Sequence, residues 1–186
     1  MNLEAEILKE HSKRQTIKIG KWVGNDPKRF RQLMALFLRG DYRVTQRSAW
    51  IVSYSSDHYP ALIRPWLPAM VKKMQEPGVH EAVLRNVVRI LQCVDIPRPI
   101  LGRVMAQCFD YLASPGYPIA VRAKAMTVLC NIAKKQPAIR GELRAMIEQM
   151  LPHAGSGLLS RGRKVLRQLD SLSDRTPSGE KTAHHH

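Results

Sequence analysis

Apolar residues recur at helical spacing throughout residues 118–136 and cover most of the circumference of the helix that this stretch predicts. The apolar arc consists of two rows: Ile119, Ala123, Met126 and Cys130 in the first, and Ala125, Val128, Leu129 and Ile132 in the second. A helix with so wide an apolar arc must be sandwiched between other elements. Only one narrow polar strip is expected to remain exposed, formed by Lys124, Thr127 and Asn131 at spacing i, i+3, i+7.

The same design occurs twice upstream, in residues 44–52 and 83–91. When Arg47, Arg85 and Lys124 are aligned, each is followed by a small or short residue and then by an apolar one, and successive copies lie 38 and 39 residues apart. A degenerate fourth copy occupies residues 160–166, as expected of a terminal repeat. A self-similar period of about 35 to 47 residues with helical units is typical of a helix-pair solenoid.

The run from Val121 to Leu129 resembles the second helix of a HEAT repeat, whose pattern is Val-Arg, then Ala, then a pair of aliphatic residues. The resemblance covers roughly residues 26–170. It implies an all-α, right-handed α-α superhelix of about four helix pairs with an N-terminal helical cap. It implies no particular activity, because this architecture serves many functions.

Residues 1–173 are expected to form one helical-repeat domain, and residues 174–186 a disordered tail that ends in an affinity-tag remnant, His184–His186. Ser12 either caps a second N-terminal helix or lies within a continuous one. Pro65 and Pro68 bend the helix around them or delay its start until near Trp66. No stretch alternates as a β-strand would. The helices are expected at residues 2–24 (one or two helices), 28–39, 42–56, 60–75, 79–94, 100–113, 118–136, 137–151 and 158–172.

The composition, with 44% hydrophobic and 24% charged residues, is that of an ordinary globular chain, but its charge is unbalanced. Lys and Arg total 30 against 15 Asp and Glu, which gives a net charge of +15. Such an excess attracts polyanions over a long range, although it is also compatible with a basic surface that only water covers.

No apolar run reaches the roughly 20 residues that span a bilayer, and the N-terminus lacks a signal-peptide core. We expect a cytoplasmic monomer with no membrane partner.

Signatures of catalysis and metal binding are absent from the sequence. Cys93, Cys108 and Cys130 lie in apolar helical contexts and are expected to be reduced thiols in the core. There is no His-Glu-x-x-His or Cys-x-x-Cys motif, no Gly-rich phosphate loop and no nucleophile elbow. We therefore predict no metal, no cofactor and no catalytic residue.

The second helices of the pairs are expected to stack side by side and to line the concave face of the solenoid. Every copy then offers a cation at an equivalent position along its helix. Such a series of cations could follow a phosphate backbone. Trp50 and Tyr54, one turn apart, would add a stacking surface for unpaired bases. The candidate binding residues on this face are Arg43, Arg47, Trp50, Tyr54, Arg85, Arg89, Lys124, Asn131, Arg161 and Lys164.

Each of these residues also has a structural interpretation. Asp41, Asp57 and Asp95 lie at turns, where they could neutralise Arg47, Arg85 or their neighbours. Aromatic residues at helical spacing lie in the core more often than on a binding surface. Exposed rings at positions 50 and 54 would favour a nucleic-acid partner, and buried rings an acidic protein.

Three functions remain open. The first, which we favour, is a non-enzymatic module whose basic concave face binds a polyanion, nucleic acid ahead of acidic protein. The second is a scaffold for an acidic peptide or helix. The third follows from a resemblance in architecture to alkylpurine DNA glycosylases built from HEAT-like helix pairs, although no segment matches that family residue by residue. The positions that could imitate its site are Trp50, Tyr54, Arg47 and either Asp41 or Asp57.

Overall fold

The computed structural model describes residues 1–173, all of whose regular elements are helical. Three short 3₁₀ segments connect or extend the α-helices: η1 (Arg64–Trp66), η2 (Pro137–Ile139) and η3 (Leu151–His153). The tail predicted for residues 174–186 lies outside the described residues. The α-helices are α1 (Leu3–Lys9), α2 (Lys13–Val23), α3 (Pro27–Arg39), α4 (Tyr42–His58), α5 (Pro60–Ile63), α6 (Leu67–Met74), α7 (Glu81–Leu91), α8 (Arg98–Ala113), α9 (Ile119–Lys135), α10 (Arg140–Met150) and α11 (Ser156–Ser173).

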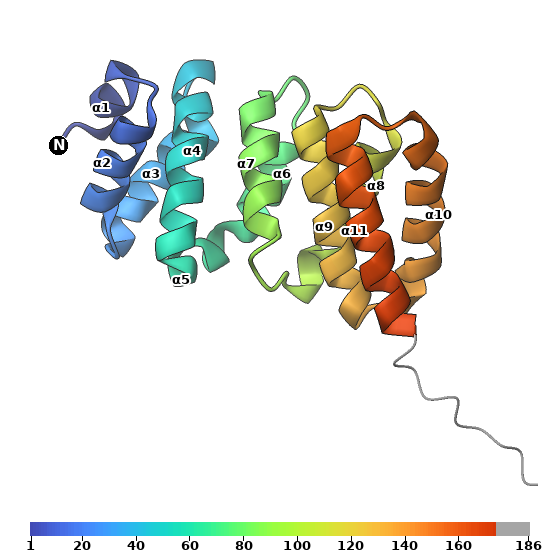
Figure 1. Cartoon of the computed structure of the whole chain (residues 1–186). Helices are drawn as coiled ribbons and strands as arrows, with labels where there is room; N and C mark the ends of the chain where they lie inside the picture. Colours follow the sequence, from blue (N-terminus) through green and yellow to red (C-terminus); the bar gives the residue numbers. More distant parts are fainter. Residues whose placement is uncertain (174–186) are drawn as a thin grey trace, which may run out of the picture.

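The helices form two layers (Figure 1). The helices α2, α4, α7, α9 and α11 lie side by side in one layer, while α3, α6, α8 and α10 make the other. The pairs are α3 with α4, α6 with α7, α8 with α9, and α10 with α11, and the short α5 contacts α4. The helix α1 packs on α2 and α4 at the N-terminal end. This confirms the predicted all-α solenoid of four helix pairs with an N-terminal cap.

Side chains at the helix starts explain where the chain turns. The Ser12 hydroxyl accepts a hydrogen bond from the Gln15 amide at 3.1 Å, so the N-terminal region is two helices and not one. Asp26 caps α3, with Pro27 at the first helical position. Asp41 caps α4 by accepting from the Val44 amide at 2.9 Å. Three of the predicted helix boundaries therefore follow from local capping chemistry alone.

Several helices differ from the prediction at their ends, and two of these differences affect the residues around them. The segment from Pro60 breaks into α5, η1 and α6, and the last of these starts just after Trp66. The helix α7 is shorter than predicted, because the His80 ring accepts from the Ala82 amide and starts the helix there. It ends at Leu91, so Cys93 lies beyond it and is exposed. The prediction that all three cysteines lie in the core is wrong for Cys93 and correct for Cys108 and Cys130.

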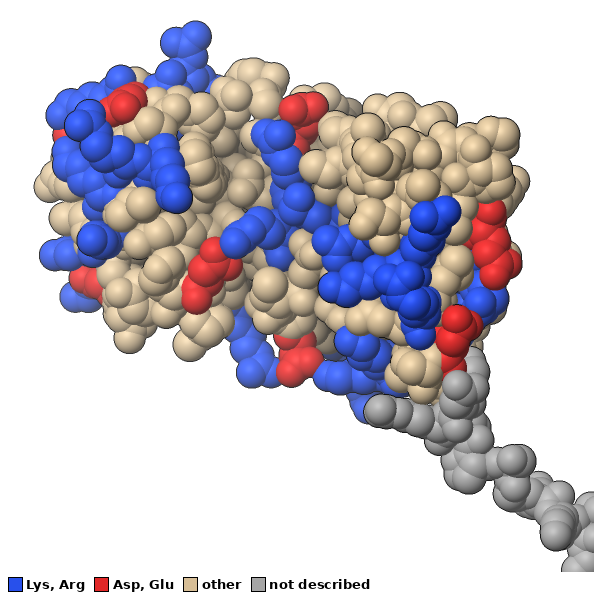
Figure 2. All heavy atoms as spheres, viewed as in Figure 1, with Lys and Arg blue, Asp and Glu red and all other residues tan. Residues whose placement is uncertain are grey.

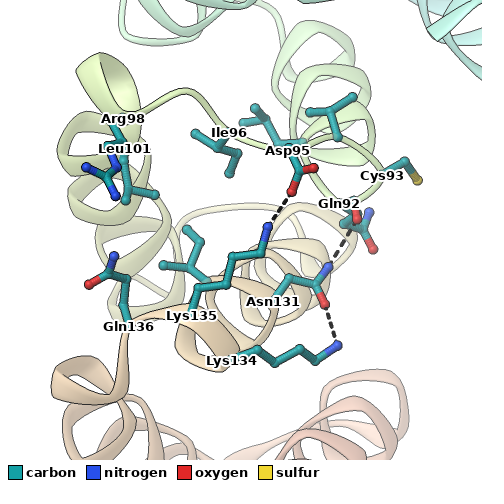
Figure 3. A pocket seen from close by; sticks show the side chains of 13 residues that line it. Gln92, Cys93, Asp95, Ile96, Arg98, Leu101, Asn131, Lys134, Lys135 and Gln136 are labelled. Atoms are coloured by element: carbon teal, nitrogen blue, oxygen red, sulfur yellow. Dashed lines mark hydrogen bonds and ion pairs between the residues drawn. The ribbon is translucent and has the colours of Figure 1, made fainter.

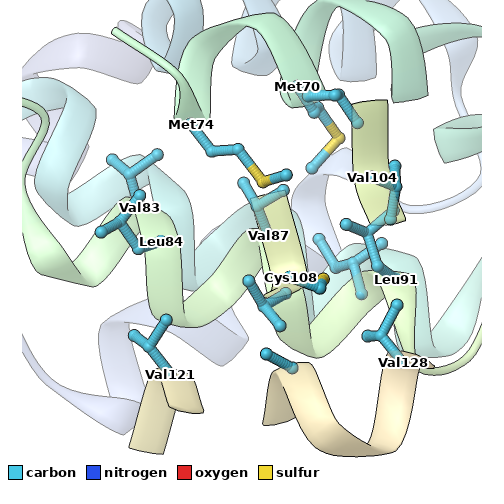
Figure 4. Close-up of a cluster of buried hydrophobic side chains, with 14 of the residues drawn as sticks. Met70, Met74, Val83, Leu84, Val87, Leu91, Val104, Cys108, Val121 and Val128 are labelled. Atoms are coloured by element: carbon cyan, nitrogen blue, oxygen red, sulfur yellow. The ribbon is translucent and has the colours of Figure 1, made fainter. Parts of the chain in front are cut away.

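The core runs continuously between the two layers. Figure 4 shows side chains of α6, α7, α8 and α9 meeting around Cys108. The helix α9 contacts α7, α8, α10 and α11, and Val128 is fully buried within it. Its polar strip, residues 124, 127 and 131, is partly exposed as predicted. Ile119 was expected in the buried arc but is 58% exposed, since it begins the helix at the edge of the layer. No helix of residues 1–173 combines the length and apolar character needed to cross a bilayer.

Candidate functional site

Basic side chains gather on the exposed side of α4, α7, α9 and α11, which we call the second-helix face. In Figure 2 a band of Lys and Arg runs from α7 across α9 to α11, and a separate group covers the N-terminal end. The centre of the band is a cluster from three consecutive second helices: Arg85 and Arg89 on α7, Lys124 on α9 and Arg161 on α11. We call these four residues the cation cluster. Partial burial, and then repulsion from the three arginines, lowers the pKa of Lys124.

The members of the cation cluster differ in how well they are neutralised. The Arg89 guanidinium donates to both carboxylate oxygens of Asp57, at 2.6 and 3.1 Å, and to the Ser53 hydroxyl at 2.6 Å. The hydrogen bonds to Asp57 raise the pKa of Arg89. Within residues 1–173, the only ion pair of Arg85 is a long contact of 3.9 Å to Glu81 in its own helix, which contributes little in water.

Lys124 and Arg161 are the unneutralised members. Within residues 1–173 no carboxylate lies within ion-pair distance of either side chain. Both are half-buried, so solvent screens their charges less than it screens those of fully exposed residues. The centre of the band therefore carries positive charge that the described part of the protein does not compensate.

A hollow of about 330 Å³ lies beside the cation cluster. On α7 its wall has helical spacing i, i+3, i+4, i+7, and on α4 it has spacing i, i+4. We call it the Trp50 hollow, because the indole of Trp50, 36% exposed, supplies its aromatic surface. Its lining residues are His11, Gln46, Trp50, Ala82, Arg85, Asn86, Arg89 and Lys124.

His11 reaches the Trp50 hollow from the turn between α1 and α2. Its ring meets the indole of Trp50 at an angle of 67°, with the ring centres 5.7 Å apart. Burial, and then the charges of Arg47 and Arg85, lower the pKa of His11. An anion bound in the hollow would oppose that repulsion and raise the pKa again.

Two of the predicted face residues serve the N-terminal cap instead. The Arg47 guanidinium donates to the carbonyl oxygens of Leu8 at 2.7 Å and Ile7 at 3.3 Å, near the C-terminus of α1. The ring of Tyr54 covers Gly20 of α2, where an added Cβ would lie 2.2 Å from a ring carbon. Tyr54 is half-buried and does not line the Trp50 hollow, so the predicted pairing of Trp50 with Tyr54 on one open surface is wrong.

The remaining predicted residues lie apart from the Trp50 hollow. The Asn131 amide donates to the Gln92 carbonyl at 3.0 Å and thereby ties α9 to the end of α7. Arg43 is exposed at the first turn of α4, and Lys164 is exposed on α11 one turn beyond Arg161. Lys164 thus extends the band, and Arg43 lies toward its N-terminal edge.

Sequence reasoning missed three polar residues of the hollow, His11, Gln46 and Asn86, and the apolar Ala82. The two amides carry a usable signal, since Gln46 precedes Trp50 by four residues and Asn86 precedes Arg89 by three. His11 has no such signal, because only the tertiary packing of the cap on α4 brings it there.

A larger hollow, of about 610 Å³, lies where α7 ends and α8 begins (Figure 3). The carboxylate of Asp95 and the amine of Lys135 meet across it at 2.6 Å, which lowers the pKa of Asp95. Ile96 and Leu101 contribute apolar surface. This hollow has no aromatic lining residue, and its one carboxylate is already bound by a lysine.

The two carboxylates that could imitate a glycosylase site both have structural partners. Asp41 accepts from a backbone amide at the start of α4, and Asp57 is bound by Arg89. In the part of the chain that the structure describes, no three His, Cys, Asp or Glu side chains lie close enough to hold a metal ion together. The second-helix face is therefore a positively charged surface beside an aromatic hollow.

Comparison with known proteins agrees with the repeat architecture. The model of the HEAT repeat domain matches residues 3–169, which span the N-terminal cap and nearly all of the four helix pairs. No curated protein and no solved structure matches the chain. The periodic sequence, the two layers of paired helices and this match agree, and the chain belongs to the HEAT repeat family.

Proposed function

We propose that this protein is a non-enzymatic binding module whose second-helix face engages a polyanion, with nucleic acid favoured over acidic protein. HEAT repeats in general serve as scaffolds for binding, which supports the coarser part of the proposal. The observation that carries the finer part is the cation cluster, in which Lys124 and Arg161 have no carboxylate partner within residues 1–173.

An anion at this cluster would relieve unfavourable charge. Arg85, Arg89 and Arg161 all repel Lys124, so a phosphate among them replaces repulsion by attraction. The three helices present their cations in series, which suits a partner with repeated charges. Each phosphate contact displaces counterions, so affinity should fall steeply as salt rises.

The exposed indole of Trp50 favours nucleic acid over an acidic peptide. It lies in the same hollow as Arg85 and Lys124, so one partner could meet both an aromatic ring and cations. Bases stack on aromatic rings while phosphates meet cations, a combination that an acidic peptide does not require.

The proposal is tested by fluorescence anisotropy with labelled single- and double-stranded DNA and RNA, at about 50 and 200 mM salt. The test variant is Lys124→Glu/Arg161→Glu. The control is Lys72→Glu/Arg103→Glu, which makes the same charge change at exposed positions of α6 and α8 in the other layer. We expect the test variant to bind more weakly and to lower the slope of log affinity on log salt by about 1.5 to 2 in magnitude, and the control to change both much less.

Two results would overturn the proposal. Equal losses in the two variants would mean that net charge matters and the cluster does not. Failure of the wild-type protein to bind any of the four nucleic acids at the lower salt would exclude nucleic acid. A labelled poly-glutamate peptide that bound under those conditions would then identify an acidic protein as the partner class.

A further inference from the structure

We propose that the Trp50 hollow accepts one unpaired base, so that the protein prefers single-stranded nucleic acid to duplex. This inference rests on the proposed function and specifies the class of nucleic acid. The hollow, about 330 Å³, lies at the lower end of the roughly 300 to 1,000 Å³ typical of small-ligand sites, a size that suits a single heterocycle.

The polar groups of the hollow suit the edge of a base. The Asn86 amide nitrogen donates to the Ala82 carbonyl at 2.7 Å, which leaves the side-chain oxygen available as an acceptor. Gln46 is half-buried and its side chain makes no hydrogen bond within residues 1–173, so its amide offers both a donor and an acceptor. A base inserted against Trp50 would thus find partners for its polar edge, although the flexible amides impose no strict sequence.

The cations at the other side of the hollow suit the adjoining phosphates. Arg85 and Lys124 line the hollow itself, and Arg161 lies beyond Lys124 on the next helix. A strand with one base against the indole would therefore bring its neighbouring phosphates into the cation cluster. In a duplex the bases are paired and stacked on one another, so no base face is available to lie against the indole.

The packing of Trp50 indicates that its position is fixed. The His11 ring meets the indole at 5.7 Å between centres, and Ala49 and Ile51 on either side are buried in the core. Tyr42 is the first residue of the same helix, is 64% exposed and lies outside the hollow. It provides a matched aromatic control on α4.

The test compares a single-stranded oligothymidylate with an abasic strand of the same length, which carries the same phosphates and no bases. We expect the wild-type protein to bind the oligothymidylate about tenfold more tightly, which is the usual effect of stacking one base. Trp50→Ala should bring this ratio close to one and leave affinity for the abasic strand unchanged. Tyr42→Ala should keep the wild-type ratio.

A second measurement does not require removing Trp50. In the variant Trp22→Phe/Trp66→Phe, Trp50 is the remaining tryptophan, and its fluorescence should be quenched by oligothymidylate but not by the abasic strand. The inference is wrong if Trp50→Ala keeps the ratio, or if wild-type protein binds both strands equally and the fluorescence is unchanged by both. Those results leave phosphate binding intact. Absence of binding to either strand also overturns this inference, and it overturns the nucleic-acid part of the proposed function when duplex DNA and RNA are not bound either.

Discussion

Arg47 and Lys124 occupy equivalent positions in the repeat, yet their side chains have different roles. Arg47 on α4 donates to two carbonyl oxygens of the N-terminal cap. Lys124 on α9 has no carboxylate partner in residues 1–173 and lies in the cation cluster. The repeat pattern therefore fixes where a cation is placed, and the neighbouring elements decide whether it is free to bind.

The cause of the difference is the helix that covers α4. The helix α1 packs on α4, and its last carbonyl groups need hydrogen-bond donors. Arg47 supplies them. Within residues 1–173, no further helix covers the side of α9 that carries Lys124. This side chain therefore remains half-buried and in contact with solvent. The N-terminal end of the second-helix face is thus closed, and its centre is open.

The largest expected effect is the loss of stability on disrupting the buried side of α9, the helix that carries the open region. Val128 is fully buried in α9, so Val128→Asp places a carboxylate among apolar side chains and should cost several kcal/mol, on the order of the whole stability. We expect the variant to lose its cooperative urea transition. Thr127→Asp, on the neighbouring polar strip, is the control and should remain folded. A folded Val128→Asp protein would show that α9 does not hold the face together.

Replacing Arg47 and Lys124 one at a time by methionine tests directly whether the two side chains have different roles. Arg47→Met removes a charged donor from two carbonyl groups, and we expect it to lower the free energy of unfolding by about 1.5 to 3 kcal/mol. Lys124→Met removes repulsion and should leave stability unchanged or raised, while it weakens polyanion binding. Urea denaturation and anisotropy measured on both variants separate the two roles. Similar stability losses in the two would contradict the distinction between the closed and the open region.

Substitution of two glycines should have opposite effects on stability, one in the closed region and one in the layer that contains α8. An alanine at Gly20 would meet the Tyr54 ring, so the expected strain exceeds the gain in helix propensity and Gly20→Ala should destabilise by about 1 kcal/mol. Gly102 on α8 faces open space, and Gly102→Ala should stabilise by about 1 kcal/mol. Combining Gly20→Ala with Tyr54→Ala should cost less than the two single changes together. Additive losses in that thermal-denaturation cycle would mean that the ring does not cover Gly20.

The architecture was predictable because its causes are local and periodic. Ser12, Asp26 and Asp41 cap helices through bonds to amides two or three residues away, and the apolar arc of α9 is visible in any helical projection. Both kinds of signal lie within about one helical turn or one repeat. The positions of the second helices, and with them the cation cluster, follow from the same information.

The details of the site were less predictable because they depend on distant parts of the chain. The Arg47 contacts join residues 39 and 40 positions apart, and Asp57 binds Arg89 at a separation of 32. Asp57 was correctly named as an acid that could neutralise a face arginine, but the sequence did not indicate which one. The contact of His11 with Trp50 exists only because the N-terminal cap packs on α4, and the periodic pattern of the sequence does not predict that packing.

The smallest expected effect is a pH dependence confined to the cap. Hydrogen bonds from Lys18, and then from Lys9 and Gln15, lower the pKa of Glu6 from 4.5 to about 2. Its ionised form is therefore stabilised by folding, and this contribution is complete above about pH 4.5 and is lost as pH falls toward 2. In urea denaturation, the difference in stability between wild type and Glu6→Gln should narrow as pH falls through that window.

Glu4→Gln provides the matched control, since Glu4 is an exposed carboxylate on the same helix that forms no ion pair within residues 1–173. Its difference from wild type should vary less between pH 7 and pH 3 than that of Glu6→Gln. A Glu6→Gln difference that stayed constant with pH would mean that the lysines of α1 and α2 do not act on this carboxylate. The cap would then be closed by Arg47 and apolar packing alone, and its lysines would be as free to meet a polyanion as Lys124 of the cation cluster.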